Sequence, residues 1–460
     1  MKKKLLLILL LFIGLFSCKK KDTDSQTTWI GGQIVNPKLD YVIFAQGEYI
    51  LDTVKLDSNN FFLYHTDKMK DGLYILRHNE TQVFYINPGD SIMLHVNTLD
   101  FDESLAYSGR GAEKNNLLMD LYLKKELENK LLPSWYTLSP EEFTAKIDSI
   151  RSYKLNKYED FIAKNKVDEG FKNAALTCIN YDYYSKKELY GMANRIRADQ
   201  LGDDFYSFRK DIDFEKEELR FYYPYYRFIN RHFDNLLVSR NEPGVDRFSY
   251  QFSLDKLKTI DSTIVNDSIR NSLMRFTALR YLFNANSAEE EKLFYKEFEK
   301  MNNNPKHLRE IKELTDATIE MSKGSAIPNV PLINTDNTII GLHNVIRKPS
   351  ILYFWTVKSK NQARVIHNRI AELKSKYPEY SFIGINTDDH YRNWRNYAKS
   401  QGYDLANEYQ LENAVESEKT LVLSSMNKSI IIDKDKTILD GNTNIFNSNF
   451  EELLLGYLNR

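Results

Sequence analysis

Cysteine, glycine and proline are scarce in this sequence, and neither sign of charge prevails. Only 2 cysteines occur in 460 residues, so at most one disulfide can form within the chain. Glycine and proline number 18 and 11, well under the roughly 12% of average usage, which disfavours a loop-rich all-β architecture for most of the length. Because 63 basic residues face 64 acidic residues, no global positive field exists to bind nucleic acid.

The residues that are present describe a globular protein of several domains. Hydrophobic residues make up 42% of the chain, aromatic residues 13% and charged residues 28%, which excludes a disordered or collagenous chain. A domain has roughly 100–200 residues, so the length predicts about three domains. We therefore expect a multidomain α+β protein in which helix predominates.

The first 17 residues have the pattern of an export signal. Lys2–Lys4 precede an apolar run, Leu5–Phe16, which is too short to span about 30 Å of hydrocarbon. The segment Leu15–Cys18 resembles the bacterial lipobox, which implies cleavage after Ser17 and a lipid on Cys18. An ordinary secretory signal with an incidental cysteine is the alternative.

A lipid on Cys18 implies a protein of the bacterial cell envelope, anchored in the outer membrane and facing the periplasm or the cell surface. Residues 18–28 are polar and predict a flexible tether. Lys19–Lys21 either lie on anionic headgroups or remain solvated, and the sequence leaves this open. The expected partners are the membrane, through the anchor, and a protein or peptide of the envelope.

The second cysteine, Cys178, lies in the apolar-periodic stretch Phe171–Ile179. If Cys18 carries a lipid, no intramolecular disulfide remains. The pattern predicts that Cys178 is a buried small hydrophobic residue, and a reactive thiol is the alternative.

Residues 29–110 alternate short β-type runs with turn signals. Strands are expected at 41–45, 61–64, 73–76, 83–86 and 91–96, and they predict a small antiparallel β-sandwich. The turn Pro88–Ser91 and the exit segment Tyr107–Asn115 resemble the N-terminal β domain, of the DUF4369 type, found in lipoproteins of the Bacteroidota.

Residues 111–324 have helical periodicity and predict an α-helical insert. Leu117, Leu118 and Leu121 share one face of a first helix. Capping boxes begin at Ser139, with proline at the first helical position, and at Ser287. Asn302–Pro305 separates a last helix, which ends near Gly324.

Aromatic residues are dense in this insert, at Tyr181–Tyr184 and Phe221–Phe228. Tyrosines with interleaved charged residues can line a groove for a glycan or a peptide. More often such residues pack helices together, and we favour the packing interpretation.

Residues 325–460 alternate strand and helix patterns, which predict an α/β domain. Strands are expected at 350–355 and 380–386, helices at 361–376, 391–400 and 449–458, and a closing hairpin at 428–433 and 437–439. Three segments carry a resemblance to the TlpA and alkyl-hydroperoxide-reductase (AhpC/TSA) type of thioredoxin-like domain: Ile327–Val330, Tyr353–Thr356 and Ile431–Lys436.

That resemblance implies a redox site whose residues this chain does not have. In the family, the strand leads into Trp-Cys-x-x-Cys at a helix N-terminus, where a thiol pKa is lowered. The two cysteine positions fall on Ser359 and Gln362, and the cis-proline of the family falls on Asn427. The domain contains no cysteine, so the resemblance implies a redox-inactive member with no catalytic residue.

Two other polar groups were candidates for binding. Lys358, Ser359 and Lys360 can hold an anion at a helix start, but we favour a helix cap at Ser359 with solvated lysines. Asp388–His390 suggests a metal, but a site needs further ligands, so we expect neither a metal nor a cofactor.

The leading hypothesis is therefore a lipid-anchored envelope protein whose thioredoxin-like domain acts in binding or assembly. One alternative is a TlpA-like thiol-disulfide oxidoreductase that uses Cys178 or the thiol of a partner. The other is glycan or peptide binding by the aromatic helical region.

Overall fold

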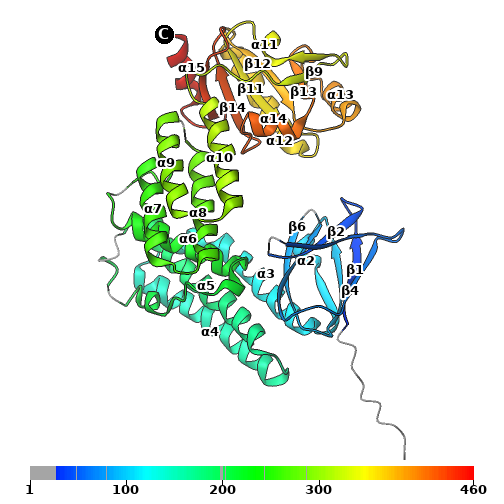
Figure 1. Cartoon of the computed structure of the whole chain (residues 1–460), viewed down its shortest axis with the longest axis vertical. Coiled ribbons are helices and arrows are strands. Elements are labelled where there is room, and N and C mark those ends of the chain that lie inside the picture. The colour runs from blue at the N-terminus through cyan, green and yellow to red at the C-terminus, as the bar shows by residue number, and fades with distance from the viewer. Residues whose placement is uncertain are drawn as a thin grey trace, which may run out of the picture. The chain divides into compact units, whose positions relative to one another are not determined.

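The chain forms two compact units, residues 1–243 and residues 244–460. The computed structural model (Figure 1) describes residues 27–459 apart from residues 48, 79, 197–199, 203, 243 and 286. The predicted signal peptide and Cys18 lie outside the described residues. The boundary between the units falls inside the predicted helical insert, so the insert contributes helices to both units.

The first unit begins with a β-sandwich of two four-stranded sheets. One sheet has the order β4-β1-β7-β8 and contains β1 (Thr28–Val35), β4 (Phe61–Thr66), β7 (Ser91–Asn97) and β8 (Ala106–Arg110). The other has the order β3-β2-β5-β6 and contains β2 (Tyr41–Gln46), β3 (Tyr49–Lys55), β5 (Gly72–His78) and β6 (Glu80–Ile86). Strands β1 and β7 are parallel, and the other pairs are antiparallel.

All five predicted strands of this region are present, and three further strands were not predicted. β3 has almost no buried residue, so its sequence has no alternation of apolar and polar residues to detect. β1 contains Gly31 and Gly32, which weaken its strand signal; a Cβ atom on Gly32 would lie 2.1 Å from the Leu94 carbonyl oxygen. The prediction that Thr28 belongs to the tether is wrong, because Thr28 is buried at the start of β1.

Four long helices complete the first unit. They are α3 (Ala112–Trp135), α4 (Pro140–Lys164), α5 (Glu169–Asn194) and α6 (Tyr223–Val238), with a short helix α2 (Phe101–Ser104) and the 3₁₀ turns η2 (Ser207–Asp211) and η3 (Glu217–Leu219). The predicted capping box at Ser139 is confirmed. The Glu142 backbone N–H donates to the Ser139 hydroxyl, and the Ser139 backbone N–H donates to the Glu142 carboxylate. Pro140 is the first helical residue, as predicted.

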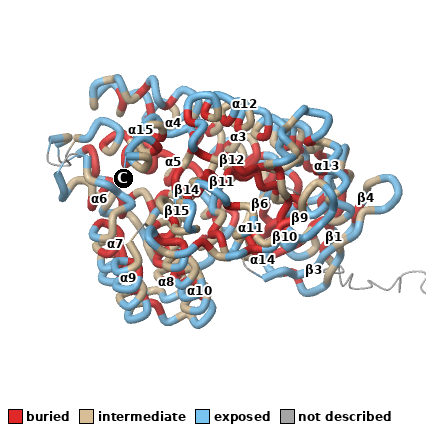
Figure 2. The backbone as a smooth tube through the Cα atoms, turned by 90° about the horizontal axis from the view of Figure 1, so that it is seen from above, coloured by how far each residue is buried: buried red, intermediate tan, exposed pale blue. Residues whose placement is uncertain are grey.

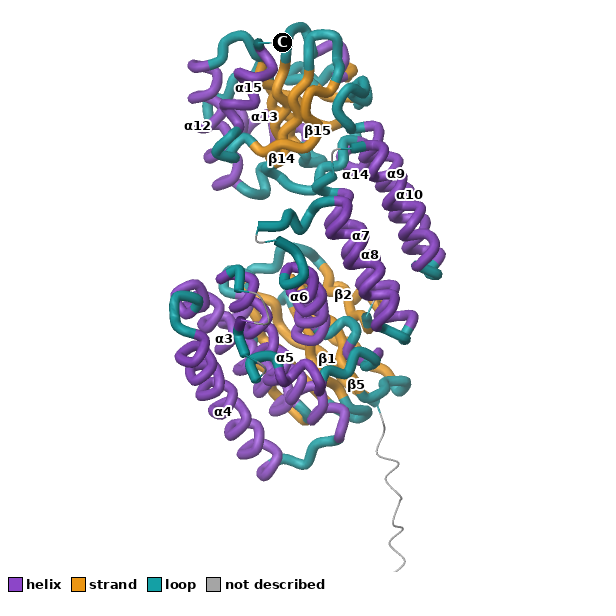
Figure 3. The backbone as a smooth tube through the Cα atoms, turned by 90° about the vertical axis from the view of Figure 1, so that its left-hand side faces the viewer, coloured by secondary structure: helices purple, strands orange, loops and turns teal. Residues whose placement is uncertain are grey.

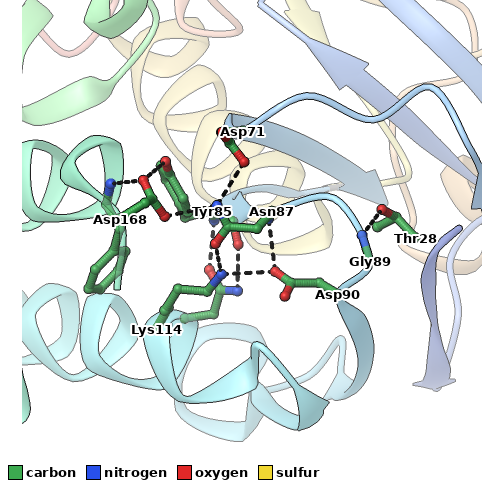
Figure 4. A network of polar contacts seen from close by, with 10 residues as sticks. Thr28, Asp71, Tyr85, Asn87, Gly89, Asp90, Lys114 and Asp168 are labelled. Atoms are coloured by element: carbon green, nitrogen blue, oxygen red, sulfur yellow. Dashed lines mark hydrogen bonds and ion pairs between the residues drawn. The ribbon is translucent and has the colours of Figure 1, made fainter. Parts of the chain in front are cut away.

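A polar network joins the sandwich to the helices of this unit (Figure 4). The Lys114 ammonium on α3 lies 2.9 Å from the Asp90 carboxylate and also hydrogen-bonds to Asn87. Asp168, the N-cap residue of α5, accepts hydrogen bonds from the Tyr85 hydroxyl at 2.6 Å and from the Asn87 amide at 2.8 Å. Because each buried charge has partners from another element, the sandwich and the helices are held as one unit.

The second unit begins with four helices: α7 (Tyr250–Thr263), α8 (Asp267–Leu282), α9 (Ala288–Met301) and α10 (Pro305–Glu320). Figure 3 shows α9 and α10 side by side. The side chains of Ser249, Asn266, Ser287 and Asn304 each accept a backbone hydrogen bond at the start of one helix. The helix starts predicted at Ser287 and Pro305 are therefore confirmed.

A seven-stranded mixed sheet forms the rest of the second unit, in the order β10-β9-β13-β12-β11-β14-β15. Its strands are β9 (Pro331–Ile333), β10 (Ile339–Gly341), β11 (Ser350–Trp355), β12 (Ser381–Asn386), β13 (Glu408–Leu411), β14 (Lys428–Ile432) and β15 (Ile438–Asn444). Every residue of β11 is buried, as Figure 2 shows for the sheet centre, because helices cover both faces.

The helices beside this sheet are α11 (Leu342–Val345), α12 (Lys360–Lys376), α13 (Tyr391–Ser400), α14 (Ala414–Thr420) and α15 (Phe450–Leu458). Residues of α12, α13 and α15 share one apolar core with the sheet, and residues of α10 and α11 share the other. The predicted fold class is confirmed, including the order of the long strands and helices in this unit. Among the described residues, no helix is both long enough and apolar enough to cross a membrane.

Candidate functional site at the start of helix α12

The loop between β11 and α12 is held by a buried carboxylate. Asp388 is 4% exposed and accepts hydrogen bonds from the Thr356 hydroxyl at 2.5 Å and the Val357 backbone N–H at 2.6 Å. The Asn386 amide donates to the same carboxylate at 2.9 Å. Asp388 therefore fixes the chain as it leaves the sheet, and it is committed to these protein donors rather than to a ligand.

Ser359 stands at the N-cap position of α12 and is exposed. Its side chain makes no cap hydrogen bond, so the expected cap exists by position only. The hydroxyl also has no hydrogen-bonded base among the described residues. A serine hydroxyl without such a base is a weak nucleophile.

Gln362 connects the helix to the loop before β14. Its side-chain N–H group donates to the carbonyl oxygens of Phe354 and Met426, both at 3.2 Å. The next residue after Met426 is Asn427, and the described residues contain no cis peptide bond. Gln362 therefore lies close to the loop of Asn427. Its amide joins α12 to this loop through a hydrogen bond.

The two lysines beside Ser359 are exposed. The Lys358 ammonium lies 3.9 Å from Asp388 and 4.0 Å from Asp389, so its charge is already near two carboxylates. Lys358, Ser359 and Lys360 lie together at the helix start, and all three are exposed. Within the described part of the chain, no group of three or more candidate metal ligands occurs around Asp388–His390 or elsewhere.

A buried polar cluster lies below this surface, centred on Glu408 of β13. Glu408 is 1% exposed and accepts hydrogen bonds from the Tyr353 hydroxyl at 2.6 Å and the Trp355 indole N–H at 2.8 Å. His367 of α12 places Nε2 3.1 Å from the same carboxylate. Burial and the neighbouring carboxylate raise the pKa of Tyr353 well above its ordinary value, so its hydroxyl remains a donor.

His367 lies between a backbone carbonyl and the Glu408 carboxylate. Its Nδ1 faces the Ala363 carbonyl oxygen at 2.7 Å, so this nitrogen carries a hydrogen. The other ring nitrogen, Nε2, faces Glu408. Gly384 makes room for the carboxylate, because a Cβ atom there would lie 2.4 Å from Glu408 Oε1.

Sequence reasoning missed both Glu408 and His367. Their side chains meet across 41 residues of sequence, and neither belongs to a motif. The one available signal was a glutamate at the start of an otherwise strand-like run. A carboxylate is rarely buried without partners, so a glutamate in a buried strand indicates that partner groups lie close to it.

Cys178 lies in the first unit, on α5, and is 7% exposed. Burial raises the pKa of its thiol, and the nearby Asp182 carboxylate acts in the same direction. The thiol hydrogen-bonds to the buried Tyr222. A thiolate is therefore disfavoured here, in agreement with the prediction of a buried, unreactive cysteine.

The aromatic residues of the first unit mainly pack against one another. Tyr181 and Phe228 form an edge-to-face pair at 5.1 Å, and Tyr184 stacks on Phe208 at 4.6 Å. The Tyr225 hydroxyl donates to a backbone carbonyl at 2.9 Å. Phe221 and Tyr222 line a cavity of about 360 Å³ in the first unit.

Residues 347–438 match the Thioredoxin-like family. The chain is similar to the thioredoxin domain of a thiol-disulfide oxidoreductase from Bacteroides vulgatus, with 14% identity over 30% of this chain and 97% of that chain and a TM-score of 0.24. A domain of a "possible thiol-disulfide isomerase" from Cytophaga hutchinsonii has 18% identity over 30% of this chain and 93% of that chain, with a TM-score of 0.26. A thiol:disulfide interchange protein from a Bacteroides species has 15% identity over 26% of this chain and 80% of that chain, with a TM-score of 0.22. No curated protein matches the chain.

The second unit thus contains a thioredoxin-like domain, as its resemblance implied. The matched residues include Ser359, Gln362 and Asn427 and contain no cysteine. Cys178, the one described cysteine, lies outside that domain.

Proposed function

We propose that this protein is a lipid-anchored lipoprotein of the bacterial envelope whose thioredoxin-like domain binds or assembles other envelope components and does not exchange disulfides. The observation that carries the proposal is the pair Ser359 and Gln362 at the start of α12, where the family resemblance implies two thiols. The hydroxyl has no base, and the amide hydrogen-bonds to two backbone carbonyls.

The chemistry of disulfide exchange explains why this pair is decisive. Exchange needs a thiolate that attacks a disulfide sulfur through a mixed disulfide. Neither a hydroxyl nor an amide forms that intermediate at neutral pH. The helix start can still contact a partner, because Lys358, Ser359 and Lys360 are exposed and belong to a rigid scaffold.

The direct test is insulin reduction by dithiothreitol with purified protein as catalyst. We expect no acceleration over the uncatalysed rate. The double variant Ser359→Cys/Gln362→Cys is the matched positive control, because it restores two thiols at the start of α12, where the helix dipole favours a thiolate. Turnover by the unmodified protein above the rate of a Cys178→Ala variant would refute the proposal.

The lipid anchor has its own test. The segment Leu15–Cys18 supports cleavage and acylation at Cys18, and incorporation of a labelled fatty acid in cells measures it. We expect label on the unmodified protein and none on a Cys18→Ser variant. Equal labelling of the two proteins would contradict the lipobox interpretation.

The alternative of an oxidoreductase that uses Cys178 has little support. The thiol is buried, its pKa is raised, and it lies outside the thioredoxin-like domain. Ligand binding by the aromatic helices has limited support too, because these rings mostly contact one another.

A further inference from the structure

A small cavity of about 290 Å³ lies in the second unit, where the ends of α8 and α10 meet the sheet edge. Strand β15 approaches the helices closely: a Cβ atom on Gly441 would lie 2.1 Å from the Met321 carbonyl oxygen. The Asn442 amide also donates to the Phe283 carbonyl at 2.7 Å. The volume is just below the range of about 300–1,000 Å³ for small-molecule sites, so only a small ligand fits.

Apolar and polar residues contribute to the lining in similar numbers. The apolar residues are Phe283, Ala285, Met321, Val422, Leu439 and Leu453. The charged residues are Lys323, Lys428 and Asp440, and the other polar ones are Thr318, Ser322, Asn442 and Tyr457. The cavity thus offers an apolar surface and charged groups to one ligand.

Lys428, the first residue of β14, is the unusual member of this lining. The residue is 4% exposed, and its ammonium donates to the carbonyl oxygens of Leu421 at 3.0 Å and Val422 at 2.8 Å. It forms no ion pair with any described residue. An ammonium has three N–H donors, so one donor of a buried cation remains without a protein acceptor.

The backbone that receives these two hydrogen bonds is itself strained. Val422 has a φ of 50°, in the left-handed region that a β-branched residue rarely adopts. The two hydrogen bonds from Lys428 therefore fix this turn and also fix the position of the ammonium.

The charges in the lining do not balance. Two ammonium groups face one carboxylate, and Lys323 is exposed at the edge of the cavity. Burial lowers the pKa of Lys428 to about 8, and burial raises the pKa of Asp440. Lys428 and Asp440 attract each other, but this attraction offsets only part of the effect of burial on each pKa, and a bound monoanion would add to the compensation at Lys428.

We propose that this cavity binds a small monocarboxylate with an apolar body. One carboxylate oxygen accepts the third N–H of Lys428, and Lys323 attracts the anion at the entrance. The apolar body lies against Leu453 and the neighbouring aliphatic residues. This site is separate from the start of α12, because none of its lining residues belongs to the loop of Ser359.

The experiment is a titration of the full chain with benzoate at pH 7, followed by ¹³C methyl NMR of leucine and valine. We expect saturable shifts of Leu453 and Val422 with a dissociation constant of about 1 mM or tighter. Benzamide, which has the same shape without the charge, is the matched ligand control and should bind at least about tenfold more weakly, as expected for loss of a charged hydrogen bond.

Two variants separate the site from a general effect. Lys428→Met removes the ammonium and retains the length of the side chain, and Leu453→Trp fills the cavity without a change in charge. We expect each to weaken benzoate binding at least about tenfold, whereas Lys399→Met, an exposed lysine on α13, leaves it unchanged. If Lys428→Met fails to fold, Leu453→Trp decides the matter. Absence of saturable binding, equal binding of benzamide, or full binding by Leu453→Trp overturns the proposal.

Discussion

Replacing Glu408 with leucine tests whether the buried cluster below α12 stabilises the second unit. The change keeps the approximate volume and removes both acceptor oxygens. The Trp355 indole N–H and the Tyr353 hydroxyl then remain buried without acceptors, at about 1–3 kcal/mol for each unsatisfied group. The total of about 4 kcal/mol corresponds to a fall of about 10 °C in the melting temperature of a unit of this size.

Glu408→Gln separates hydrogen bonding from charge. The glutamine oxygen can accept from the Trp355 indole N–H, while its amide can donate to the Tyr353 hydroxyl oxygen. Only the Tyr353 hydroxyl hydrogen then lacks the acceptor that Glu408 provides, so we expect this variant to lose about 2 kcal/mol, less than Glu408→Leu. Glu412→Leu changes an exposed glutamate just after the same strand. It is the matched control and should change stability by about 0.5 kcal/mol at most.

Urea unfolding followed by ¹⁹F NMR of 5-fluorotryptophan resolves the two units. Of the 4 tryptophans, Trp355 and Trp394 report on the second unit, while Trp29 and Trp135 report on the first. The Trp394 signal is the cleaner probe, because Trp355 contacts the mutated residue. A loss below about 1 kcal/mol in Glu408→Leu, or an equal loss in Glu408→Gln and Glu408→Leu, would refute the reasoning.

Three further predictions follow from local geometry. Gly384→Ala places a methyl group 2.4 Å from the Glu408 carboxylate and should destabilise the second unit by about 2 kcal/mol in urea unfolding. Gly456→Ala, at an open position in α15, is the control and should stabilise this unit by about 0.5 kcal/mol. Effects of equal sign would contradict this prediction. Burial raises the pKa of Glu291 to about 7 from its ordinary 4.5, so the stability of the second unit should fall as pH rises between these two values, because the unfolded carboxyl releases its proton first. Glu291→Gln should remove that fall, and an unchanged pH profile would be the opposing result. In a Cys18→Ser protein at pH 8, Cys178 should react with a thiol reagent at least about 100-fold more slowly than after denaturation, and similar rates would revive an oxidoreductase role for it.

Much of the fold was readable from local patterns. The apolar run of β11 and the periodicity of α12 and α13 mark their elements, since burial on one face recurs at the spacing of a strand or a helix. Capping residues such as Ser139 locate helix starts for the same local reason. Short or fully exposed strands, β3 among them, were not predicted because their burial pattern does not distinguish them from loops.

The residue types themselves settled that the thioredoxin-like domain has no thiol, since identity at Ser359 and Gln362 is read directly from the chain. Only the tertiary structure shows that Glu408 contacts Tyr353, Trp355 and His367. It also shows that Lys428 lines a cavity together with residues from distant helices. Burial and long-range hydrogen bonds depend on which elements pack together, and no short stretch of sequence contains that information.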